Sequence, residues 1–301
     1  MSDADAPPRA RLGPYRLIRR LGRGGMAEVF LATAFGASGF EKKVAIKTLL
    51  PELQGNGELE RLLIEEAKLG GLLSHRNLIG VQELGVDAGV YWVRMDYVDG
   101  LDLKTRLERG LPPPELALLI AEEVALALAY VHAFAGDDGR PLGLVHRDVS
   151  PSNILVSRAG EVKLADFGVA KATGLADITR ANVRKGKYAY MSPEQVAGAP
   201  LGPASDQFGL GVTLMELLCG RRPYDGETPL ATMERIREAA PPDVSALDVD
   251  LQELVRGCLA KAPEARFEDL ESLGRAIAAA RARRPPSSLL DLARWLQSTE
   301  G

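Results

Sequence analysis

Two acids and one amide near the middle of the chain are of the types that bind a divalent cation. Asp148 and Asn153 belong to the segment Val-His-Arg-Asp-Val-Ser-Pro-Ser-Asn, and Asp166 follows in Ala-Asp-Phe-Gly. Apolar, strand-like residues flank both segments. Mg²⁺ prefers hard oxygen ligands such as carboxylates and amide oxygens. The pattern therefore suits a Mg²⁺ site.

A glycine cluster and a strand lysine earlier in the chain suit phosphate groups. Gly22, Gly24 and Gly25 lie between two strand-like segments, and glycines allow backbone amides to come close to phosphate oxygens. The strand–turn–strand context argues against a dinucleotide-binding βαβ unit, and the cluster alone would indicate only a glycine-rich hairpin. Lys47 ends the apolar strand Val-Ala-Ile-Lys, where an unpaired ammonium is costly, so it needs an anionic partner.

In this order, the motifs resemble those of the protein kinase superfamily, and most closely the bacterial Hanks-type (eukaryotic-like) Ser/Thr kinases. The resemblance covers about residues 15–281. It implies an α+β, bilobal protein-kinase fold, with a small antiparallel β-sheet lobe carrying one regulatory helix and a larger, mainly helical lobe. It also implies that the chain uses ATP and Mg²⁺ to transfer the γ-phosphate to Ser/Thr hydroxyls of protein substrates.

The same resemblance assigns roles to individual residues. Asp148 is the base that accepts the proton of the substrate hydroxyl, and Asn153 and Asp166 hold the Mg²⁺ ions. Lys47 contacts the α- and β-phosphates and pairs with a glutamate of the next helix, for which Glu66 is favoured over Glu65. The resemblance also implies the other nucleotide contacts. Gly22, Gly24 and Gly25 would cover the phosphates, and Leu21, Val29, Ala45 and Leu155 would enclose the adenine. Met95 would guard the deeper pocket, Asp96 to Val98 would form the hinge, and Asp102 would bind the ribose.

The sequence departs from the family at two positions that bear on catalysis. Ser150 stands where Ser/Thr kinases carry a lysine two residues after the catalytic aspartate, and Lys187 stands where the activation segment usually carries a threonine. We hypothesise that the cation has moved, so that Lys187 supplies positive charge to the γ-phosphate. The alternative is two independent changes, with Lys187 in solvent.

Two smaller departures concern the glycine hairpin and the regulatory helix. Ala27 replaces the third glycine of the hairpin, which is a small change in volume. Gly70 and Gly71 fall inside the expected helix, where each glycine costs about 1 kcal/mol relative to alanine. The pair indicates either a helix that deforms easily or a close packing contact.

Other matched residues indicate regulation and architecture. Arg147, before the catalytic aspartate, is the residue that binds a phosphorylated activation segment in many kinases, with Thr179 as the first candidate and Thr173 as the second. An unmodified surface threonine is the alternative. Glu194 in Ser-Pro-Glu is expected to pair with Arg266. Asp206 is expected to brace the backbone of the catalytic loop, or else to serve only as an acid at a helix N-terminus.

Composition narrows the function classes. The 301 residues include 37 Lys and Arg and 41 Asp and Glu, a formal net charge of −4, which disfavours nucleic-acid binding. Hydrophobic residues make up 46%, enough for a sizeable core. The two cysteines, Cys219 and Cys258, fit a reducing compartment, and the longest apolar stretch, 116–131, falls short of a membrane span because Glu122 and Glu123 interrupt it. These features predict a cytoplasmic protein with no membrane span in this chain.

The hydrophobic pattern divides the chain at about residues 97–101. Residues 1–12 are expected to be a flexible leader and 13–281 the kinase domain, with lobes 13–97 and 98–281. The expected strands are 15–18, 28–33, 43–47, 79–84 and 90–97, with a turn at 87–89, and the expected helices are 58–73, 114–134, 206–218, 228–239, 248–260 and 267–281. The tail 282–301 contains a short amphipathic stripe. The stripe could dock on the large lobe, mediate association or lead into further chain.

Two rival functions remain at this point. The first is a catalytically weak pseudokinase that acts as a nucleotide-binding scaffold, and the second is a small-molecule phosphotransferase of kinase-like fold. The presence of Lys47, Asp148, Asn153 and Asp166 favours an active enzyme, and the segment ending in Ser-Pro-Glu, with Arg266, favours protein substrates. The catalytic loop resembles the Ser/Thr class rather than the Tyr class. Self-association for trans-autophosphorylation is a further hypothesis.

Overall fold

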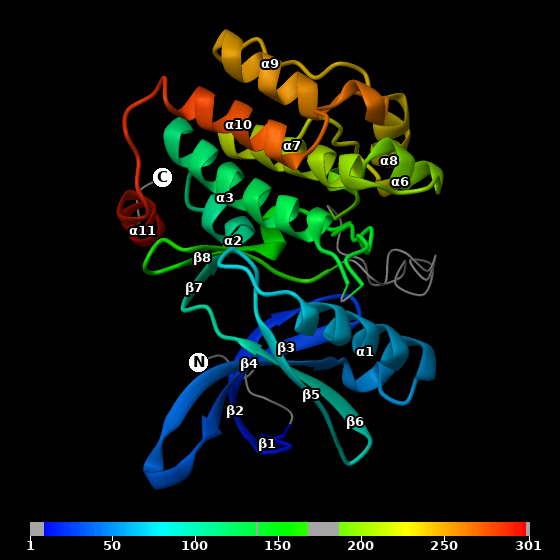
Figure 1. The fold of residues 1–301 in the computed structure, drawn as a ribbon, viewed down its shortest axis with the longest axis vertical. Helices are drawn as coiled ribbons and strands as arrows, with labels where there is room; N and C mark the ends of the chain where they lie inside the picture. Colours follow the sequence, from blue (N-terminus) through cyan, green and yellow to red (C-terminus); the bar gives the residue numbers. More distant parts are fainter. Residues whose placement is uncertain (1–8, 137, 168–186, 299–301) are drawn as a thin grey trace. The chain divides into compact units, whose positions relative to one another are not determined.

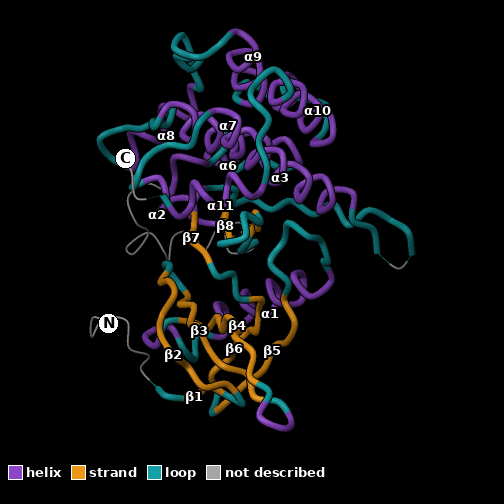
Figure 2. Tube along the Cα trace, turned by 90° about the vertical axis from the view of Figure 1, so that its left-hand side faces the viewer, coloured by secondary structure: helices purple, strands orange, loops and turns teal. Residues whose placement is uncertain are grey.

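The chain folds into two units, each with its own architecture. The computed structural model describes residues 9–136, 138–167 and 187–298. Among them, unit 1 contains the residues up to Ser74 together with Ile79–Tyr97, and unit 2 contains His75–Leu78 and everything from Val98 onward. Unit 1 is built mainly of strands with one long helix, and unit 2 mainly of helices (Figures 1 and 2). An antiparallel sheet in one unit and mainly helices in the other agree with the α+β class expected from the sequence.

Unit 1 is a six-stranded antiparallel sheet with the strand order β1-β2-β3-β4-β6-β5. Alternating apolar residues and β-branched side chains favour these strands, and the predicted turn at 87–89 joins the last two. Ala88 and Gly89 there both have positive φ, at 47° and 81°, as a two-residue hairpin loop requires. The elements of unit 1 are β1 (Arg11–Leu12), β2 (Tyr15–Arg23), β3 (Ala27–Phe35), η2 (Ala37–Gly39), β4 (Glu41–Leu49), η3 (Pro51–Leu53), α1 (Gly57–Leu72), β5 (Val81–Asp87) and β6 (Val90–Asp96).

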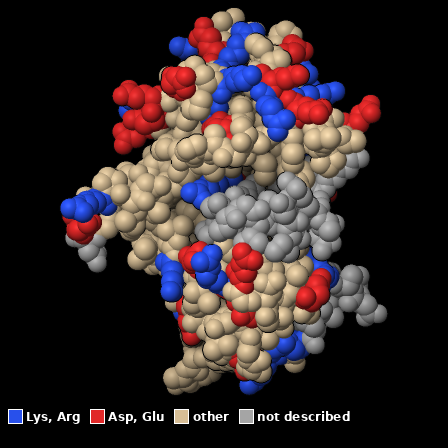
Figure 3. Space-filling view, turned by 90° about the vertical axis from the view of Figure 1, so that its right-hand side faces the viewer, with Lys and Arg blue, Asp and Glu red and all other residues tan. Residues whose placement is uncertain are grey.

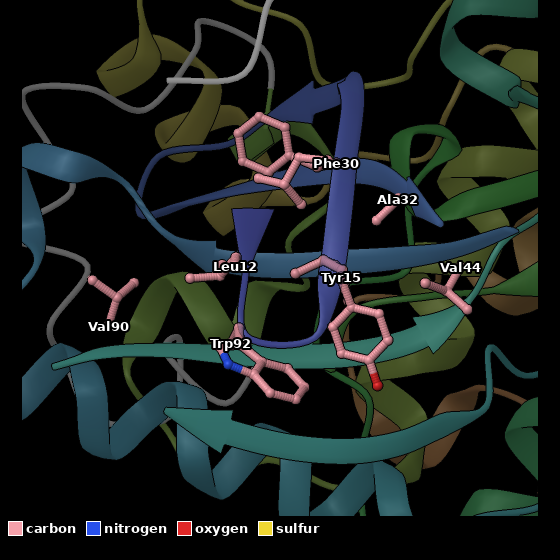
Figure 4. Close-up of a cluster of buried hydrophobic side chains, with 9 residues drawn as sticks. Leu12, Tyr15, Phe30, Ala32, Val44, Val90 and Trp92 are labelled. Atoms are coloured by element: carbon pink, nitrogen blue, oxygen red, sulfur yellow. The ribbon is translucent and has the colours of Figure 1, made fainter. Parts of the chain in front are cut away.

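One face of this sheet is covered by the chain's own N-terminal segment. Leu12 and Tyr15 pack with Trp92, whose ring centroid lies 5.1 Å from that of Tyr15, in the cluster shown in Figure 4. Leu12 is only 1% exposed, and its strand β1 pairs with β2. The expectation of a flexible leader through residue 12 is therefore wrong for Arg11 and Leu12, because burying Leu12 outweighs the polar composition around it. Residues 1–8 lie outside the described chain.

Helix α1 covers part of the sheet through its leucine face. Asn56 begins the helix, because its side chain accepts hydrogen bonds from the backbone N–H groups of Glu58 and Leu59. Leu59, Leu62 and Leu63 lie in a buried cluster with Leu49 and Val93 of the sheet. The predicted helix 58–73 is thus confirmed to within one residue at each end.

The two glycines of α1 have different surroundings, which predicts opposite effects of alanine. A Cβ at Gly70 would lie 2.5 Å from Cγ2 of Val81, whereas one at Gly71 would meet nothing within 4 Å. Gly70→Ala is therefore expected to lower the free energy of unfolding by about 1–3 kcal/mol through overpacking. Gly71→Ala, the matched control, is expected to raise it by up to about 1 kcal/mol through helix propensity. Urea unfolding of both variants tests this, and equal effects would contradict it.

Unit 2 is a set of helices with one small sheet of order β7-β8-β9. Helix α6 begins with a capping box, Ser192 with Gln195, and α10 with another, Asp269 with Ser272. The elements of unit 2 are β7 (Gly100–Asp102), α2 (Leu103–Leu107), α3 (Pro114–Ala133), η4 (Pro151–Asn153), β8 (Ile154–Ser157), β9 (Val162–Leu164), η5 (Lys187–Tyr190), α6 (Pro193–Ala197), α7 (Pro203–Cys219), α8 (Pro229–Glu238), α9 (Val249–Cys258), η6 (Pro263–Ala265), α10 (Leu270–Arg281) and α11 (Leu289–Gln297).

Helix α3 forms the centre of unit 2 and packs against α7, α10 and β9. Among the described helices, it is the one that is long and apolar enough to cross a membrane by length and composition, but most of it is buried by its neighbours. The two glutamates that interrupt its apolar stretch have partners: Glu122 pairs with Arg281 at 2.7 Å, and Glu123 with Arg76 at 2.7 Å. These contacts are those of a core helix in a folded domain.

The short segment His75–Leu78 belongs to unit 2, although strand β5 of unit 1 follows it. The Asn77 side chain donates to Glu123 at 2.6 Å and to the carbonyl of Val162 at 2.9 Å. The backbone N–H of Leu164 donates to the carbonyl of Asn77 at 2.7 Å. Asn77, together with the Arg76–Glu123 pair, thus holds the segment against α3 and β9. The hydrophobic pattern of the sequence did not predict these contacts.

Other differences from the predicted elements are small. Helix α7 begins three positions before the predicted start at 206, because Pro203 can occupy the first turn without losing a hydrogen bond. Strand β7 and helices α2 and α6 were not predicted, since each is five residues or shorter. The amphipathic stripe of the tail forms α11, which docks on unit 2 and buries Leu292, Trp295 and Leu296. Of the three hypotheses for the stripe, docking on the large lobe is confirmed.

Charged side chains of both signs are intermixed on the surface of unit 2 over the face shown in Figure 3. Among the ion pairs of unit 2, Arg222 pairs with Asp225 at 2.8 Å and Arg221 with Asp243 at 3.1 Å, so opposite charges also lie close together in the fold. The formal net charge of −4 is therefore not gathered into one area on this face.

Candidate active site

The strand register of unit 1 puts four of the predicted nucleotide-binding residues on one face of the sheet. Val29 of β3 lies opposite Lys47 of β4, and Ala45 of β4 lies opposite Met95 of β6. Directly opposed residues in an antiparallel pair project to the same side, and so do Ala45 and Lys47, which are two apart on one strand. This face therefore presents the small and apolar side chains of Val29, Ala45 and Met95 beside the ammonium of Lys47.

The lysine has the acidic partner that the sequence required. Lys47 Nζ lies 2.6 Å from Oε1 of Glu66 on α1, and the two side chains are only 8% and 13% exposed. Removing either partner would leave a buried charge, which is costly. The pair therefore fixes the ammonium in place, and the preference for Glu66 over Glu65 is confirmed.

The glycine hairpin between β2 and β3 is held by backbone hydrogen bonds. The N–H of Gly24 donates to the carbonyl of Ala27 at 2.8 Å, and that of Leu50 donates to the carbonyl of Met26 at 2.9 Å. A Cβ at Gly22 would meet nothing within 4 Å, and Gly22 does not have a positive φ. The fold itself therefore does not require glycine at this position, and the absence of a side chain leaves the backbone of the hairpin open to the approach of a ligand.

In unit 2, one carboxylate shapes the catalytic loop. Asp206, 1% exposed at the start of α7, accepts hydrogen bonds from the backbone N–H groups of His146 and Arg147, both at 2.7 Å. Its Oδ2 also lies 2.8 Å from Nε2 of His132. Arg147 has a φ of 69°, a strained value for a residue with a Cβ. The predicted bracing role of Asp206 is confirmed, and it explains how this strained backbone is held.

The histidine of the loop is fully buried and neutral. Burial lowers the pKa of His146, against the charges of Asp206, Asp148 and Asp166. Its Nε2 lies 3.2 Å from the carbonyl oxygen of Ala165, and its Nδ1 accepts from the N–H of Asp148. A donor at Nε2 and an acceptor at Nδ1 describe the neutral imidazole, so His146 acts as a spacer between the two acidic segments rather than as a base.

The acids and the amide proposed for Mg²⁺ come together at one end of the β8–β9 pair. Asn153 precedes Ile154, which lies opposite Leu164, and the N–H of Ala165 donates to the carbonyl of Asn153 at 2.8 Å. The Asn153 amide nitrogen donates to the carbonyl of Asp148 at 2.8 Å, so the amide oxygen is the atom of this side chain that could bind a metal ion. Asp148 is 6% exposed and Asp166 has a φ of 58°.

The donor set of this site fits Mg²⁺. Within the part of the chain that the structure describes, no group of three or more His, Cys, Asp and Glu residues could by itself hold a metal ion. Mg²⁺ is usually held by one or two protein oxygens, with phosphate and water completing its shell. Asn153 and Asp166 supply that number and type of ligand.

Further predicted residues lie where β7 meets β8. Asp102 is opposite Leu155 in the strand register, and its side chain begins α2 by accepting from the N–H of Thr105 at 2.9 Å and from its hydroxyl at 2.7 Å. In unit 1, the backbone N–H of Asp96 donates to the carbonyl of Gly80, and its carboxylate accepts from Gln82. The backbone of Asp96 is thus fixed by β-sheet bonding on one side.

The two positions of the hypothesised cation swap differ in how far they are described. Ser150 is 1% exposed, and its hydroxyl lies 3.0 Å from that of Ser152. Its side chain is therefore buried and hydrogen-bonded. The backbone of Lys187 begins η5, but its side chain lies outside the described chain, as do Thr173 and Thr179.

The expected pair of Glu194 and Arg266 is present, and it is bidentate. Arg266 Nη1 and Nη2 donate to Oε1 and Oε2 of Glu194 at 2.7 and 2.9 Å, and the Ser205 hydroxyl adds a third bond at 2.8 Å. Next to it, the Gln195 amide donates to the carbonyl of Arg147 at 2.9 Å. The capping-box spacing of Ser192 and Gln195 predicts the start of α6, whereas the link to Arg147 depends on the tertiary fold.

The comparison with known proteins agrees with this arrangement. The family model described as the protein kinase domain matches residues 15–275. The chain belongs to the protein kinase family. The kinase domain of PknI from Mycobacterium tuberculosis, solved as a point mutant, superposes with a TM-score of 0.68 at 29% identity and covers 92% of this chain and 99% of that one.

The kinase domain is also similar to curated protein kinases, some named for tyrosine and others for serine and threonine as the phosphorylated residue. It is 40% identical over 274 residues to the tyrosine-protein kinase MasK of Myxococcus xanthus, covering 88% of this chain and 42% of the relative. It is 34% identical to the serine/threonine-protein kinase PrkC of Bacillus subtilis, covering 87% and 39%. The chain thus spans about two fifths of the length of these relatives.

Proposed function

We propose that this kinase domain transfers the γ-phosphate of ATP to serine and threonine hydroxyls of proteins. The observation that carries the proposal is the loop held by Asp206, in which Asp148, Asn153 and the segment of Asp166 are joined by hydrogen bonds. This arrangement can orient a hydroxyl and hold Mg²⁺, and phosphoryl transfer asks for little else besides positioning and positive charge.

The residues of each unit have distinct parts in this proposal. In unit 1, Lys47 would meet the α- and β-phosphates, the hairpin of Gly22, Gly24 and Gly25 would cover them, and Val29 and Ala45 would contact the adenine. In unit 2, Asn153 and Asp166 would hold Mg²⁺, which neutralises phosphate charge when bound. Asp148 would orient the substrate hydroxyl and accept its proton. Further adenine, hinge and ribose contacts are proposed for Leu21, Leu155, Met95, Asp96, Val98 and Asp102.

Protein substrates are favoured over small molecules by the Glu194–Arg266 pair. In kinases, this pair anchors the end of the activation segment, on which a protein substrate is received. The class of hydroxyl rests on the resemblance of the catalytic loop to that of Ser/Thr kinases, and most of the curated relatives compared bear that name. The same proposal includes autophosphorylation at Thr179 or Thr173, with Arg147 binding the phosphate group.

Free cysteines support action in a reducing compartment such as the cytoplasm. Both cysteines of the chain, Cys219 and Cys258, are unbridged. Burial raises the pKa of Cys258 to about 12, so its thiol resists oxidation. A domain that consumes ATP would also find its substrate there.

The proposal is tested by transfer of label from ATP in the presence of Mg²⁺, followed by mapping of the labelled residues. Wild-type protein is expected to label itself or a generic protein substrate on Ser or Thr, and Asp148→Asn is the inactive control. Nucleotide binding without transfer would indicate the pseudokinase function. Label on tyrosine, or on a small molecule only, would replace the proposed substrate class.

Replacement of Lys187 tests the relocated cation. If its ammonium supplies charge to the γ-phosphate, Lys187→Ala is expected to lower kcat at saturating ATP by about tenfold or more, because a fixed charge near developing charge contributes strongly. Arg158→Ala, an exposed change on unit 2, is the control. Unchanged turnover of Lys187→Ala would eliminate the hypothesis and leave two independent substitutions.

A further inference from the structure

The C-terminal helix of unit 2 is attached to the residues around the predicted ribose contact. Helix α11 packs on β8, and Figure 1 shows it beside α2 and β8. Its start approaches the β8–β9 turn so closely that a Cβ on Gly160 would lie 1.8 Å from the carbonyl oxygen of Leu289. Gly160 also has a φ of 86°, so both the close contact with Leu289 and the backbone conformation require glycine at this position.

A buried arginine connects α11 to α2. Arg106, on α2, is 1% exposed. Its guanidinium donates to the carbonyl of Trp295 at 3.1 and 2.7 Å, and to the Ser298 hydroxyl at 3.1 Å. Its Cζ also lies 4.0 Å from the centroid of the Trp295 ring. The end of α11 therefore supplies both the acceptors and the aromatic face that a buried cation needs.

Within the residues that the structure describes, the guanidinium of Arg106 donates hydrogen bonds to carbonyl and hydroxyl oxygens and not to a carboxylate. Its fourth hydrogen bond runs to the carbonyl of Gly110 at 3.1 Å. Burial lowers the pKa of Arg106, and nearby Arg109 lowers it further. Without α11, most of the bonds that compensate the burial of this guanidinium would be lost, so the position of α2 depends on α11 being docked.

Helix α2 in turn holds two parts of the candidate site. Its first residue follows Asp102, whose carboxylate forms the cap of the helix. It also packs against η4, which contains Asn153, and against β8, which contains Leu155. A shift of α2 would therefore move the ribose-binding acid first and the neighbouring η4 next.

We infer that α11 is a positioning element of the nucleotide site, which acts through Arg106 on α2 and Asp102. The inference rests on the proposed function, because it concerns affinity for the nucleotide. Neither α11 nor Arg106 is among the residues expected to contact the nucleotide; on this inference, both set the position of residues that are. The tail of this chain is thus a working part of the kinase domain.

The test is the dissociation constant of ADP with Mg²⁺, measured by calorimetry on full-length variants. Arg106→Met removes the hydrogen bonds and Trp295→Leu removes only the ring. Each is expected to raise the dissociation constant about tenfold, since small displacements of positioned groups are costly. The KM for ATP should rise similarly, while kcat changes by less than about twofold, because α11 and α2 do not carry Lys47, Asp148 or Asp166.

Matched controls separate positioning from stability. Lys104→Met and Leu290→Ala are exposed changes on α2 and α11 and should leave the dissociation constant unaltered. Trp295→Phe keeps an aromatic face for the cation and should recover the affinity to within about threefold. If Arg106→Met and Trp295→Leu melt earlier but bind ADP as the wild type does, α11 is only a structural support and the inference is overturned. A wild type that binds no ADP would instead refute the proposed function.

Discussion

Asp148→Asn is expected to lower kcat by about 100- to 10,000-fold, the range that a positioned general base contributes. Asparagine matches aspartate in size, and the hydrogen bonds that shape this loop run to backbone atoms of Asp148: its carbonyl accepts from Asn153 and its N–H donates to His146. The loop should therefore keep its shape while the proton acceptor is lost. Steady-state transfer of label from ATP to a protein substrate measures the effect.

Nucleotide affinity distinguishes this expectation from a general loss of structure. The dissociation constant of ADP with Mg²⁺ should change little in Asp148→Asn, because Asn153 and Asp166 remain. Asp138→Asn, a change of the same chemistry at an exposed acid, should leave kcat unaltered. A kcat within threefold of the wild type in Asp148→Asn would show that Asp148 is not the proton acceptor.

Arg266→Met is expected to lower the free energy of unfolding by about 3–5 kcal/mol at neutral pH. The side chains of Arg266 and Glu194 are 0% and 9% exposed, so the variant leaves a carboxylate buried without its partner. Arg266 also donates to the carbonyls of Ala260, Lys261 and Ala204, which would lose these bonds. Urea unfolding measures the loss, and Arg275→Met, whose pair with Glu271 is exposed, should cost less than about 1 kcal/mol.

The pH dependence of this loss has a defined sign. Burial alone would raise the pKa of Glu194, but hydrogen bonds from Arg266 and its charge hold that pKa below the ordinary 4.5. A lowered folded-state pKa contributes stability above about pH 4.5 and loses it as the pH falls through the folded value. In Arg266→Met the hydrogen bonds and charge of Arg266 are lost, so burial raises the pKa of Glu194. The difference between the two free energies of unfolding should therefore narrow as the pH falls, first through the raised pKa of the variant and then from about pH 4.5 through the lowered pKa of the wild type. A difference that does not change with pH would count against the buried pair as the source of the loss.

Much of the candidate site could be predicted because its residues belong to short sequence motifs. The lysine strand and the acidic segments each consist of residues close together in sequence, and their order identifies the family. The partnership of Lys47 with Glu66 followed from the need of a buried ammonium for an acid. Asp206 followed from the family pattern, although its hydrogen bonds to the loop backbone needed the structure.

The parts that could not be predicted depend on contacts between distant residues. Arg106 looks like any surface arginine of a short helix, and only the fold brings Trp295 and its carbonyl to it. Leu12 lies in a polar, proline-rich segment, and its burial depends on Trp92 of β6. Asn77 fastens its segment through Glu123 of α3. In each case, tertiary packing overrides a local composition that indicated the opposite.

The open surroundings of Gly22 have a genetic consequence. A Cβ there would meet nothing within 4 Å, so Gly22→Ala would leave the amount of folded protein unchanged, and under the proposed function it would weaken only the contact with phosphate. Unit 2, with its loop and the Glu194–Arg266 pair, would remain intact. Under the same proposal, in a cell that carries both forms, such an allele would compete with the active form for protein substrates and behave as dominant, whereas a Gly70 or Arg266 allele would be lost by unfolding and behave as recessive.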